Sequence, residues 1–372
     1  MKVLSIVGAR PNFVKIAPLH RAFSQHHEIT SKIVHTGQHY DPVMSGIFFD
    51  QLNLPKPDFC LNVAAGTPIQ QIAQIMMEFE KVMLIEKPDL VLVVGDVNST
   101  LACTLVSVKM NVPVAHVEAG LRSGDRSMPE EINRILTDAV SDHLFVTEQD
   151  AVDNLLSENV PATRIHFAGN VMIDSLAYYK EAIQNASILK TLELNAGSYV
   201  LMTMHRPSNV DGREGLERVL KIIKRLALLK TVIFPIHPRT WKNMGVYGLK
   251  NEFENIKNLK ILEPQGYLEF LNLTKNASLV VTDSGGIQEE TTYLNVPCIT
   301  LRENTERPVT VKEGTNYLLK NADEESVALV TAEIFAGNCK IGQIPEGWDG
   351  KAAERIVAIL REKYINSYVC DK

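Results

Sequence analysis

The sequence predicts an α/β protein with two similar domains, and three observations support this fold class. First, short apolar segments recur along the chain, each followed by a polar turn and a segment with helical periodicity, as in parallel strands joined by helices. Second, 372 residues are enough for two hydrophobic cores. Third, both halves open with an apolar strand and an Arg-Pro pair, at residues 10–11 and 206–207, which indicates a repeated unit.

The composition argues against several classes of function. The chain is 45% hydrophobic and 22% charged, and its net charge of −6 gives no general attraction to nucleic acid or to an anionic membrane. No apolar run approaches the length of a membrane span, and the start of the chain lacks the apolar core of a signal peptide. Five scattered cysteines without a CxxC pair fit a reducing cytoplasm, and ten histidines without an HExxH motif give no support for a metal site. We therefore expect a cytoplasmic protein.

A buried strand at residues 2–8 opens the chain, and Arg10 and Lys15 follow it at the start of a helix. A cation in the first turn of a helix opposes the helix dipole, and a local conflict of this kind often marks a functional site. An exposed lysine is the structural alternative. Because no GxGxxG motif follows this strand, the sequence does not predict a nicotinamide or flavin dinucleotide cofactor.

A second strand is expected at residues 31–36, and the polar residues 38–41 follow it. They belong to the same predicted rim of the sheet as the end of the first strand. Further on, Thr67 and Gln70 have the spacing of a capping box, with a proline at the first helical position. This pattern predicts a helix that runs from there to about Lys87.

Two carboxylates stand at the ends of consecutive strands in the first half. Asp96 follows the apolar segment 89–95, and Glu118 follows the next one, VPVAHV. Since a helix comes next, Asp96 alone is equally explained as an ordinary helix N-cap. If the two strands are parallel neighbours, however, both carboxylates come to one edge of the sheet. Paired carboxylates are typical of acid–base chemistry.

The segment from His116 to Arg134 is a charged loop between a strand end and a helix N-terminus. Pro129 suits the first turn of that helix, and Glu130 follows it. Ligand sites in α/β sheets lie at such loops. The alternative is a solvated loop held by salt bridges. Arg122 and Arg134 are equally explained as structural partners of the carboxylates.

Strands at residues 143–147 and 165–168 complete the first series of strand–helix units. The sequence then becomes irregular and polar before the next apolar strand. We therefore expect the domain boundary between residues 168 and 197, with a helix at 171–186 bridging it.

In the second half, polar residues again follow the strands. His205 and Arg206 come after the first strand, and His237 comes after the strand TVIFPI. These positions repeat the pattern of the first half, so we expect them at the C-terminal rim of the second sheet.

A turn of small residues is the second strong signal in this half. A strand ends at Asp283, residues 284–286 are Ser-Gly-Gly, and a helix follows with Glu289 and Glu290 near its start. The N–H groups of such a turn and of the helix N-terminus form a cradle for an anion, and glycine lets a phosphate approach the backbone closely. The two glutamates are candidates for ribose hydroxyls, and complementation of the helix dipole is the alternative.

Six motifs occur in the order GARPNFVKIAPL, VVGDVNST, HVEAGLRSGDRSMPEEINR, HRP, TDSGGIQEE and TERPVTVKEGTN. Together they resemble the non-hydrolysing UDP-N-acetylglucosamine 2-epimerase family over nearly the whole chain. The resemblance implies two Rossmann-like domains facing each other across a cleft, in the GT-B arrangement. We place these domains at residues 1–168 and 169–353, with the last helix, about 354–372, packing back onto the first domain. Members of the family are usually homodimers.

The resemblance implies inversion at C2 of UDP-N-acetylglucosamine (UDP-GlcNAc) to give UDP-N-acetylmannosamine (UDP-ManNAc). The expected route is anti elimination of UDP to a 2-acetamidoglucal, followed by re-addition, and it needs no cofactor and no metal. It does need an acid, a base and stabilisation of an oxocarbenium-like state, as glycosidases obtain from carboxylate pairs. The family motifs assign these roles to Asp96, Glu118 and Glu130, with His205 assisting the departing phosphate. They assign binding of the UDP-sugar to Arg10, Lys15, Arg206, His237, Ser284, Gly285, Gly286, Glu290 and Arg307, with Glu290 at the ribose.

Several alternatives stay open. Relatives that act on UDP-sugars of the diacetamido-uronate type share the start of the first motif, so the reaction type is better defined than the substrate. A hydrolysing relative would release ManNAc and UDP instead. A catalytically silent nucleotide-sugar sensor is a third alternative, but binding an anionic ligand does not require a set of carboxylates. Tyr40 and Asp41 stand where many members carry other residues, in a loop that helps to bind a second, activating substrate molecule.

Overall fold

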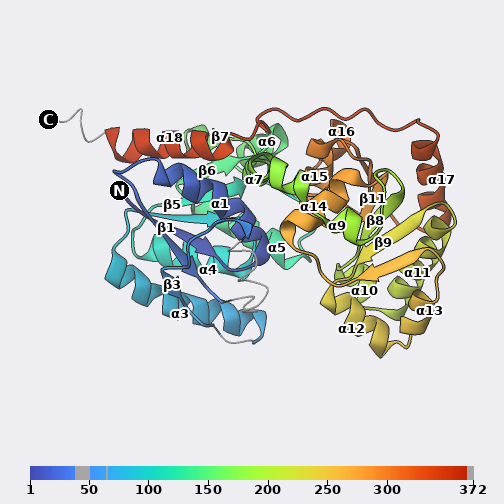
Figure 1. The fold of residues 1–372 in the computed structure, drawn as a ribbon. Helices are drawn as coiled ribbons and strands as arrows, with labels where there is room; N and C mark the ends of the chain where they lie inside the picture. Colours follow the sequence, from blue (N-terminus) through green and yellow to red (C-terminus); the bar gives the residue numbers. More distant parts are fainter. Residues whose placement is uncertain (38–50, 64–65, 367–372) are drawn as a thin grey trace. The chain divides into compact units, whose positions relative to one another are not determined.

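The computed structural model describes residues 1–37, 51–63 and 66–366, which form two α/β units, as the sequence predicts. The first unit contains residues 1–178 and the chain from Glu346 onward. The second unit contains Tyr179–Pro345. Figure 1 labels many of the helices and strands of both units.

A parallel seven-stranded sheet forms the centre of the first unit, in the order β3-β2-β1-β4-β5-β6-β7. Its strands are β1 (Lys2–Val7), β2 (Thr30–His35), β3 (Phe59–Cys60), β4 (Leu90–Val94), β5 (Val114–Ala119), β6 (His143–Val146) and β7 (Ile165–Phe167). The helices are α1 (Arg10–Ser24), α3 (Pro68–Glu86), α4 (Asn98–Lys109), α5 (Pro129–Val140), α6 (Gln149–Ser157), η1 (Ala162–Arg164), α7 (Val171–Tyr178) and α18 (Ala352–Tyr364).

Helices cover both faces of this sheet. α1 packs with α7 and α18 on one face, and α4 packs with α3 and α5 on the other (Figure 1). α3 begins with the predicted capping box, in which Gln70 N–H donates to Oγ1 of Thr67 and Thr67 N–H donates to Oε1 of Gln70. The apolar side of α3, including Phe79, packs against residues of β1 and β4. Strands β4 and β5 are buried along their whole length because helices lie on both sides of them.

The boundary between the units lies within the predicted range of 168 to 197, but the helix that was expected to bridge it is broken. A single helix at 171–186 was expected, but α7 ends at Tyr178 and a separate helix, α8 (Lys180–Asn185), follows. The two adjacent tyrosines belong to different units: the guanidinium of Arg21 lies 3.6 Å from the ring centroid of Tyr178, whereas Tyr179 packs edge-on against Tyr267. The first unit therefore ends after Tyr178, later than residue 168, because α7 packs on α1.

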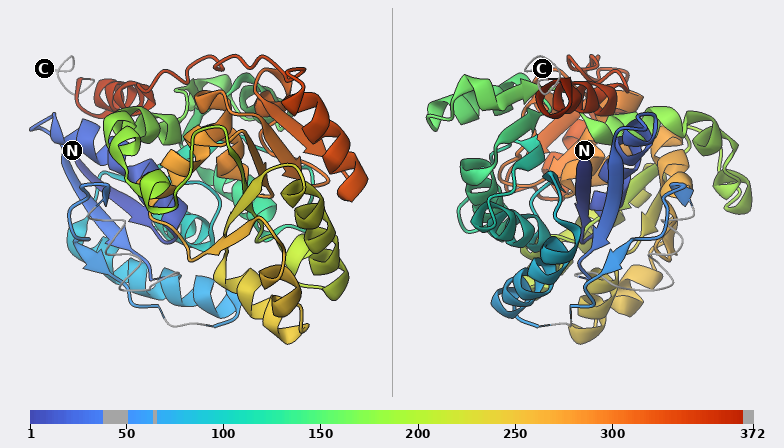
Figure 2. Two further views of the ribbon diagram at one scale, coloured as in Figure 1. Left: turned by 45° about the vertical axis from the view of Figure 1, so that its right-hand side comes forward. Right: turned by 90° about the vertical axis from the view of Figure 1, so that its left-hand side faces the viewer.

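The chain returns to the first unit through a buried tryptophan and the last helix. The indole N–H of Trp348 donates to the carbonyl oxygen of Thr147, and the Trp348 side chain is almost fully buried. The carboxylate of Asp174 in α7 then accepts the N–H groups of Ala352 and Ala353, so it caps the N-terminus of α18. Figure 2 shows α18, in dark red, beside the blue α1, in agreement with their packing.

A parallel six-stranded sheet forms the centre of the second unit, in the order β10-β9-β8-β11-β12-β13. Its strands are β8 (Tyr199–Thr203), β9 (Thr231–Pro235), β10 (Leu259–Leu262), β11 (Leu279–Thr282), β12 (Cys298–Leu301) and β13 (Asn316–Leu319). The remaining helices are α9 (Ile188–Thr191), α10 (Pro207–Val210), α11 (Arg213–Ala227), α12 (Pro238–Val246), α13 (Lys250–Glu254), α14 (Tyr267–Asn276), α15 (Gly285–Leu294), α16 (Val309–Lys312) and α17 (Glu324–Phe335).

The core of the second unit follows from the pattern of α11. Its apolar residues recur at helical spacing, and Leu216, Leu220 and Ile223 pack against β8 and β9 through residues such as Val200 and Phe234. The strand order of this sheet repeats that of the first six strands of the other unit, which is the Rossmann order. The echo between the two halves of the sequence therefore reflects a repeated topology. Within the described part of the chain, no helix is long and apolar enough to cross a membrane.

Candidate active site

The strand order reverses between β1 and β4 in the first unit, and the loops after these two strands carry polar residues. Such a switch point is where α/β sheets bind ligands. Asn12, which the sequence analysis did not single out, joins the two strand ends. Its Oδ1 accepts the N–H groups of Gly8 and Ala9, and its Nδ2 donates to the carbonyl oxygen of Val94. The buried Asn12 thus holds the backbone at the base of this site.

Lys15 and Glu118 form a buried ion pair at this edge. Lys15 belongs to α1 and is only 5% exposed, so the alternative of an exposed lysine is wrong. Its Nζ also lies against the loop after β4, because a Cβ on Gly95 would come within 3.1 Å of it. The cation therefore sits between the ends of β4 and β5, beside one of the predicted catalytic carboxylates.

Glu118 adopts a strained backbone conformation. Its φ is 72°, in the left-handed region that residues other than glycine rarely occupy. The register between β5 and β6 shifts across this residue, between Val117 and Ala119. A non-glycine residue in this region costs on the order of 1–3 kcal/mol and persists where the surroundings enforce it, often at active sites. The local geometry therefore supports a functional role for Glu118.

Asp96 lies on the neighbouring strand end, as predicted from the order of the strands. It is not an N-cap, because α4 begins at Asn98 and its N-cap residue is Val97. The Asp96 side chain is 23% exposed and forms an ion pair with Arg134 of α5. Asn133, the preceding residue of α5, donates from Nδ2 to the carbonyl oxygen of Asp96. Asp96 is therefore held by α5 while it stays accessible.

Glu131, next to the predicted Glu130, is a residue that the sequence analysis missed. Its carboxylate accepts the N–H groups of Ser123 and Gly124, each at 2.9 Å, and pairs with Nη1 of Arg134 at 2.9 Å. Glu131 is buried, whereas Glu130 is half-buried in the first turn of α5. Glu131 thus fixes the charged loop.

Arg122 and Arg134 have structural partners, one of the two explanations that the sequence left open. Arg134 bridges Asp96 and Glu131. Arg122 donates to Asp138 from Nη1 at 2.7 Å and to both carboxylate oxygens of Glu158 at 2.7 and 2.8 Å. Through Arg134, salt bridges therefore connect this segment to Asp96 on the neighbouring strand end.

The second unit has its own switch point, between β8 and β11, where Asp283 follows β11. Asp283 is fully buried and accepts the N–H groups of His205 and Arg206 and the Nδ2 of Asn209. Nδ1 of His205 lies 3.0 Å from Oδ1. Burial opposes ionisation of Asp283, but these hydrogen bonds and the histidine outweigh it and lower its pKa. Since Nδ1 of His205 faces Asp283, Nε2 is the ring nitrogen that can meet a ligand.

His237 lies close to His205, as expected for two strand ends at one rim. The centroids of their rings are 5.5 Å apart. His237 is the N-cap residue of α12, where its Nδ1 accepts the N–H of Arg239. Because Nδ1 is an acceptor, Nε2 of His237 carries the ring proton and is a donor.

The Ser-Gly-Gly turn opens α15 as predicted. Ser284 is the N-cap residue and makes no side-chain cap, and α15 starts at Gly285. A Cβ on Gly285 would lie 2.7 Å from Oε1 of Glu306 and 2.8 Å from Nη1 of Arg307. Buried Arg307 pairs with Glu289 at 2.9 Å and with Glu306 at 2.7 Å. The guanidinium of Arg307 therefore lies directly behind the turn.

The remaining predicted residues are placed as follows. Gly286 is half-buried in the first turn of α15. Half-buried Arg206 approaches Glu306, with 3.9 Å between Nη2 and Oε1. Arg10 begins α1, but its side chain lies outside the described parts, as do Tyr40 and Asp41. Among the His, Cys, Asp and Glu residues that the structure describes, no cluster has the geometry of a metal site.

The comparisons with known proteins agree with these motifs. The family model for UDP-N-acetylglucosamine 2-epimerase matches residues 21–361. The chain belongs to the UDP-N-acetylglucosamine 2-epimerase family. One relative is the UDP-N-acetylglucosamine 2-epimerase of Methanocaldococcus jannaschii, which is 45% identical over 97% of this chain and 99% of its own length. Another is the UDP-2,3-diacetamido-2,3-dideoxy-D-glucuronate 2-epimerase of Pseudomonas aeruginosa, 40% identical over 97% of this chain and 99% of its own length.

Solved structures of the family confirm the fold class. The crystal structure of the M. jannaschii UDP-GlcNAc 2-epimerase in complex with UDP-GlcNAc and UDP has a TM-score of 0.91, with 44% identity over 97% of this chain and all of that one. The Neisseria meningitidis enzyme bound to UDP-GlcNAc has a TM-score of 0.87, with 30% identity over 97% of this chain and all of that one. The isomerase class of the family fits the predicted type of reaction.

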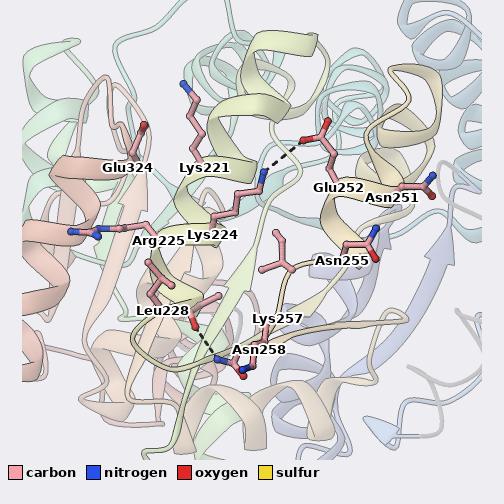
Figure 3. A pocket seen from close by; sticks show the side chains of 12 residues that line it. Lys221, Lys224, Arg225, Leu228, Asn251, Glu252, Asn255, Lys257, Asn258 and Glu324 are labelled. Atoms are coloured by element: carbon pink, nitrogen blue, oxygen red, sulfur yellow. Dashed lines mark hydrogen bonds and ion pairs between the residues drawn. The ribbon is translucent and has the colours of Figure 1, made fainter.

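A shallow cavity of about 940 Å³ lies away from the motifs of the epimerase family (Figure 3). It is lined by the end of α11, by α13 and by the residues before β10, including Lys224, Arg225 and Lys257. These residues lie near the N-terminal ends of β9 and β10, since Nδ2 of Asn258 donates to the carbonyl oxygen of Ala227. The family motifs follow the C-terminal ends of the strands, so this cavity is not part of the candidate active site.

Gly285 gives a test of the Ser-Gly-Gly turn. We expect Gly285→Ala to lower the free energy of unfolding by about 1–3 kcal/mol, because the new methyl group overlaps buried side chains of the second unit. Chemical denaturation of the variant and of the wild type measures this change. Gly212→Ala is the matched control, because a Cβ there meets no heavy atom within 4 Å. Equal effects of both substitutions would contradict the tight fit at Gly285.

Glu290 predicts a pH dependence of stability. Burial, and next the charge of Glu289, raise the pKa of Glu290 to about 8, against 4.5 ordinarily. Below about pH 4.5 Glu290 is protonated in the folded and the unfolded protein, and its contribution to stability is fully present. As the pH rises from there to about 8, the unfolded protein releases this proton while the folded protein keeps it, so the contribution is progressively lost. We therefore expect the Tm of the wild type to fall relative to that of Glu290→Gln between about pH 5 and 9. Parallel Tm curves for the two proteins would contradict this assignment.

Proposed function

We propose that this protein catalyses the reversible C2 epimerisation of UDP-GlcNAc to UDP-ManNAc through a 2-acetamidoglucal. The observation that carries the proposal is the pair of carboxylates, Asp96 and Glu118, on neighbouring strand ends of the first unit. Each has a cationic partner, Arg134 and Lys15 respectively. Carboxylates placed in this way serve acid–base catalysis and stabilise positive charge at an anomeric carbon.

The reaction balances without a redox step. The C2–H electron pair becomes the C1=C2 double bond, a carboxylate takes the proton, and the C1–O electron pair leaves with UDP. Protonation of C2 from the other face and return of UDP to C1 give the epimer. Because the C2 proton is not next to a carbonyl, departure of UDP must accompany its removal, and the developing charge at C1 then needs an anionic neighbour. Asp96, Glu118 and Glu130 are the candidates for these roles, and electrons need no external carrier.

In this proposal the second unit binds UDP. The N–H groups of Gly285 and Gly286 are suited to the diphosphate, because they open α15 and the side chain of Ser284 does not cap them. The N–H of Ser284 donates to Oγ1 of Thr282, so Ser284 is a candidate for binding UDP through its hydroxyl group. Glu290 is suited to the ribose hydroxyls. His205 presents Nε2 to the departing phosphate while Asp283 holds its Nδ1, and His237 adds a second ring nearby. Arg307 supports the turn from behind.

The substrate-binding roles of Arg10, Lys15 and Arg206 also stay proposals. Lys15 is buried against Glu118, so its cation is suited to hold the carboxylate and an anionic group of the substrate together.

A homodimer and a cytoplasmic location remain predictions that rest on the family resemblance and on the scattered cysteines. The described cysteines Cys60, Cys103, Cys298 and Cys339 form no disulfides.

Product analysis tests the proposal. Purified protein is incubated with UDP-GlcNAc, and the sugars are followed by proton NMR. We expect UDP-ManNAc to accumulate to an equilibrium mixture, with only traces of glucal and UDP. Free ManNAc with UDP in equal amounts would instead identify a hydrolysing enzyme. Binding of UDP-GlcNAc without any turnover would identify a sensor.

A diacetamido-uronate sugar is the second candidate for the substrate. It is favoured by the P. aeruginosa relative, whose identity to this chain is only a little lower than that of the M. jannaschii enzyme. The two candidates are separated by kcat/KM for each UDP-sugar under the same conditions. A higher kcat/KM for the diacetamido-uronate would reassign the substrate but keep the reaction type.

A further inference from the structure

His116 lies fully buried on β5, and both of its ring nitrogens face oxygen atoms. Nδ1 lies 2.6 Å from Oδ1 of Asp138 in α5, and Nε2 lies 2.8 Å from the carbonyl oxygen of Gly95 at the end of β4. A carbonyl oxygen can only accept, so Nε2 carries a proton. Burial opposes ionisation of Asp138, but His116 and Arg122 outweigh it and lower the pKa of Asp138, which makes its carboxylate an acceptor for Nδ1. His116 and Asp138 are therefore a buried, charge-assisted pair.

Asp138 holds the chain on both sides of Glu118. Its Oδ1 binds His116, two residues before Glu118, and its Oδ2 accepts the N–H of Gly120, two residues after it, at 3.0 Å. Arg122 donates to the same Oδ2 at 2.7 Å. A strained φ at Glu118 requires surroundings that enforce it. A single carboxylate bound at both flanks supplies that constraint.

The other side of the His116 ring reaches the strand that leads to Asp96. The carbonyl group bound by Nε2 belongs to Gly95, the residue directly before Asp96. Gly95 has a φ of 66° and donates its N–H to the carbonyl oxygen of Val117. One imidazole ring thus connects the two strand ends from which Asp96 and Glu118 emerge.

We propose that His116 and Asp138 are positioning residues that fix Asp96 and Glu118 relative to each other in the reactive geometry. This inference rests on the proposed function and deepens it. His116 and Asp138 are fully buried, so they act through the backbone of Gly95, Glu118 and Gly120 rather than on the substrate. A displacement of reacting groups by about 1 Å costs on the order of 10² in rate.

Two substitutions of His116 separate its two contacts. The amide of His116→Gln reaches the position of Nε2 and can keep the bond to Gly95, whereas the amide of His116→Asn reaches that of Nδ1 and can keep the bond to Asp138. We expect each variant to lower kcat by about 10²-fold, while KM for UDP-GlcNAc and the affinity for UDP stay within about twofold. A loss of stability alone does not produce this split when kcat is measured well below each Tm.

His143→Gln is the matched control. His143 is also a buried histidine of this sheet, on the neighbouring strand β6, and its Nε2 lies 2.8 Å from the hydroxyl oxygen of Tyr364. It begins β6, whereas the catalytic candidates follow the ends of their strands. We expect His143→Gln to lower the Tm but to leave kcat unchanged.

Arg122→Lys replaces the two His116 variants if they do not fold. Arg122 is partly exposed and binds Asp138, so this substitution weakens the contact that holds Asp138 in place. It must then lower kcat at constant KM.

The outcomes for this inference and for the proposed function are distinct. If the wild type turns over and the folded His116 variants, or Arg122→Lys in their place, keep its kcat, the inference is overturned and the proposed function stands. If the wild type turns over no UDP-sugar, the proposed function fails. A crystal structure of the folded variant then decides the inference: movement of Glu118 out of its positive φ supports it, and an unchanged Glu118 and Gly120 overturn it.

Discussion

Asp96→Asn is expected to lower kcat for C2 epimerisation by about 10²–10⁴-fold while the affinity for UDP stays unchanged. The amide occupies the same space but neither accepts a proton nor neutralises Arg134, with which Asp96 pairs. The UDP-binding residues proposed for the second unit are untouched by this change. Initial rates by coupled detection of UDP-ManNAc, and UDP titration by calorimetry, measure the two quantities separately.

Asp153→Asn is the control for the change in charge. Asp153 is an exposed carboxylate of α6 in the same unit, and it accepts a hydrogen bond from Gln149. Its replacement removes one negative charge without touching the strand ends, so kcat should stay at the wild-type value. Wild-type turnover by Asp96→Asn would remove Asp96 from the mechanism.

Arg134→Met is expected to have the largest effect on stability, a loss of about 3–5 kcal/mol in the free energy of unfolding. The substitution leaves Glu131 buried without its cation and Asp96 without its ion pair. Glu131 also loses the group that orients it toward the N–H groups of Ser123 and Gly124, so the charged loop should loosen. Chemical denaturation with fluorescence or circular dichroism measures the change.

Two further variants identify the cause of that loss. Arg134→Met combined with Glu131→Gln should recover part of the stability, because the buried charge is removed as well. Arg213→Met breaks the exposed pair with Glu217 in the second unit and should cost no more than about 1 kcal/mol. A loss below 1 kcal/mol for Arg134→Met would show that the buried network does not stabilise the fold.

The fold and the position of the two carboxylates on neighbouring strand ends could be predicted because they depend on local patterns. Asp96 and Glu118 end consecutive strands, and consecutive strands of a parallel sheet are commonly neighbours, which is what the structure shows. The Ser-Gly-Gly turn follows equally from one strand end and one helix start. In these cases the residue type and its place after a strand are sufficient to predict where the residue lies in the fold.

The residues that hold the site could not be predicted in the same way. Asp138 lies in the last turn of α5 and Asn209 in the short helix α10, and each contacts a group far along the chain: Asp138 the N–H of Gly120, and Asn209 the carboxylate of Asp283. Glu131 differs from Glu130 only by one step along a helix, and its partners come from a loop that folds back. The positive φ of Glu118 has no signal in residue type, since glutamate does not favour it. Such contacts depend on the packed fold.

The fate of the C2 hydrogen tests the proposed chemistry most directly. UDP-GlcNAc is incubated with the wild-type protein in D₂O, and C2 is followed by proton NMR and mass spectrometry. We expect each turnover to replace the C2 hydrogen with solvent deuterium, so that both epimers become labelled, and we expect Asp96→Asn to leave C2 unlabelled. Formation of UDP-ManNAc that keeps its original C2 hydrogen would contradict removal of that proton by a carboxylate.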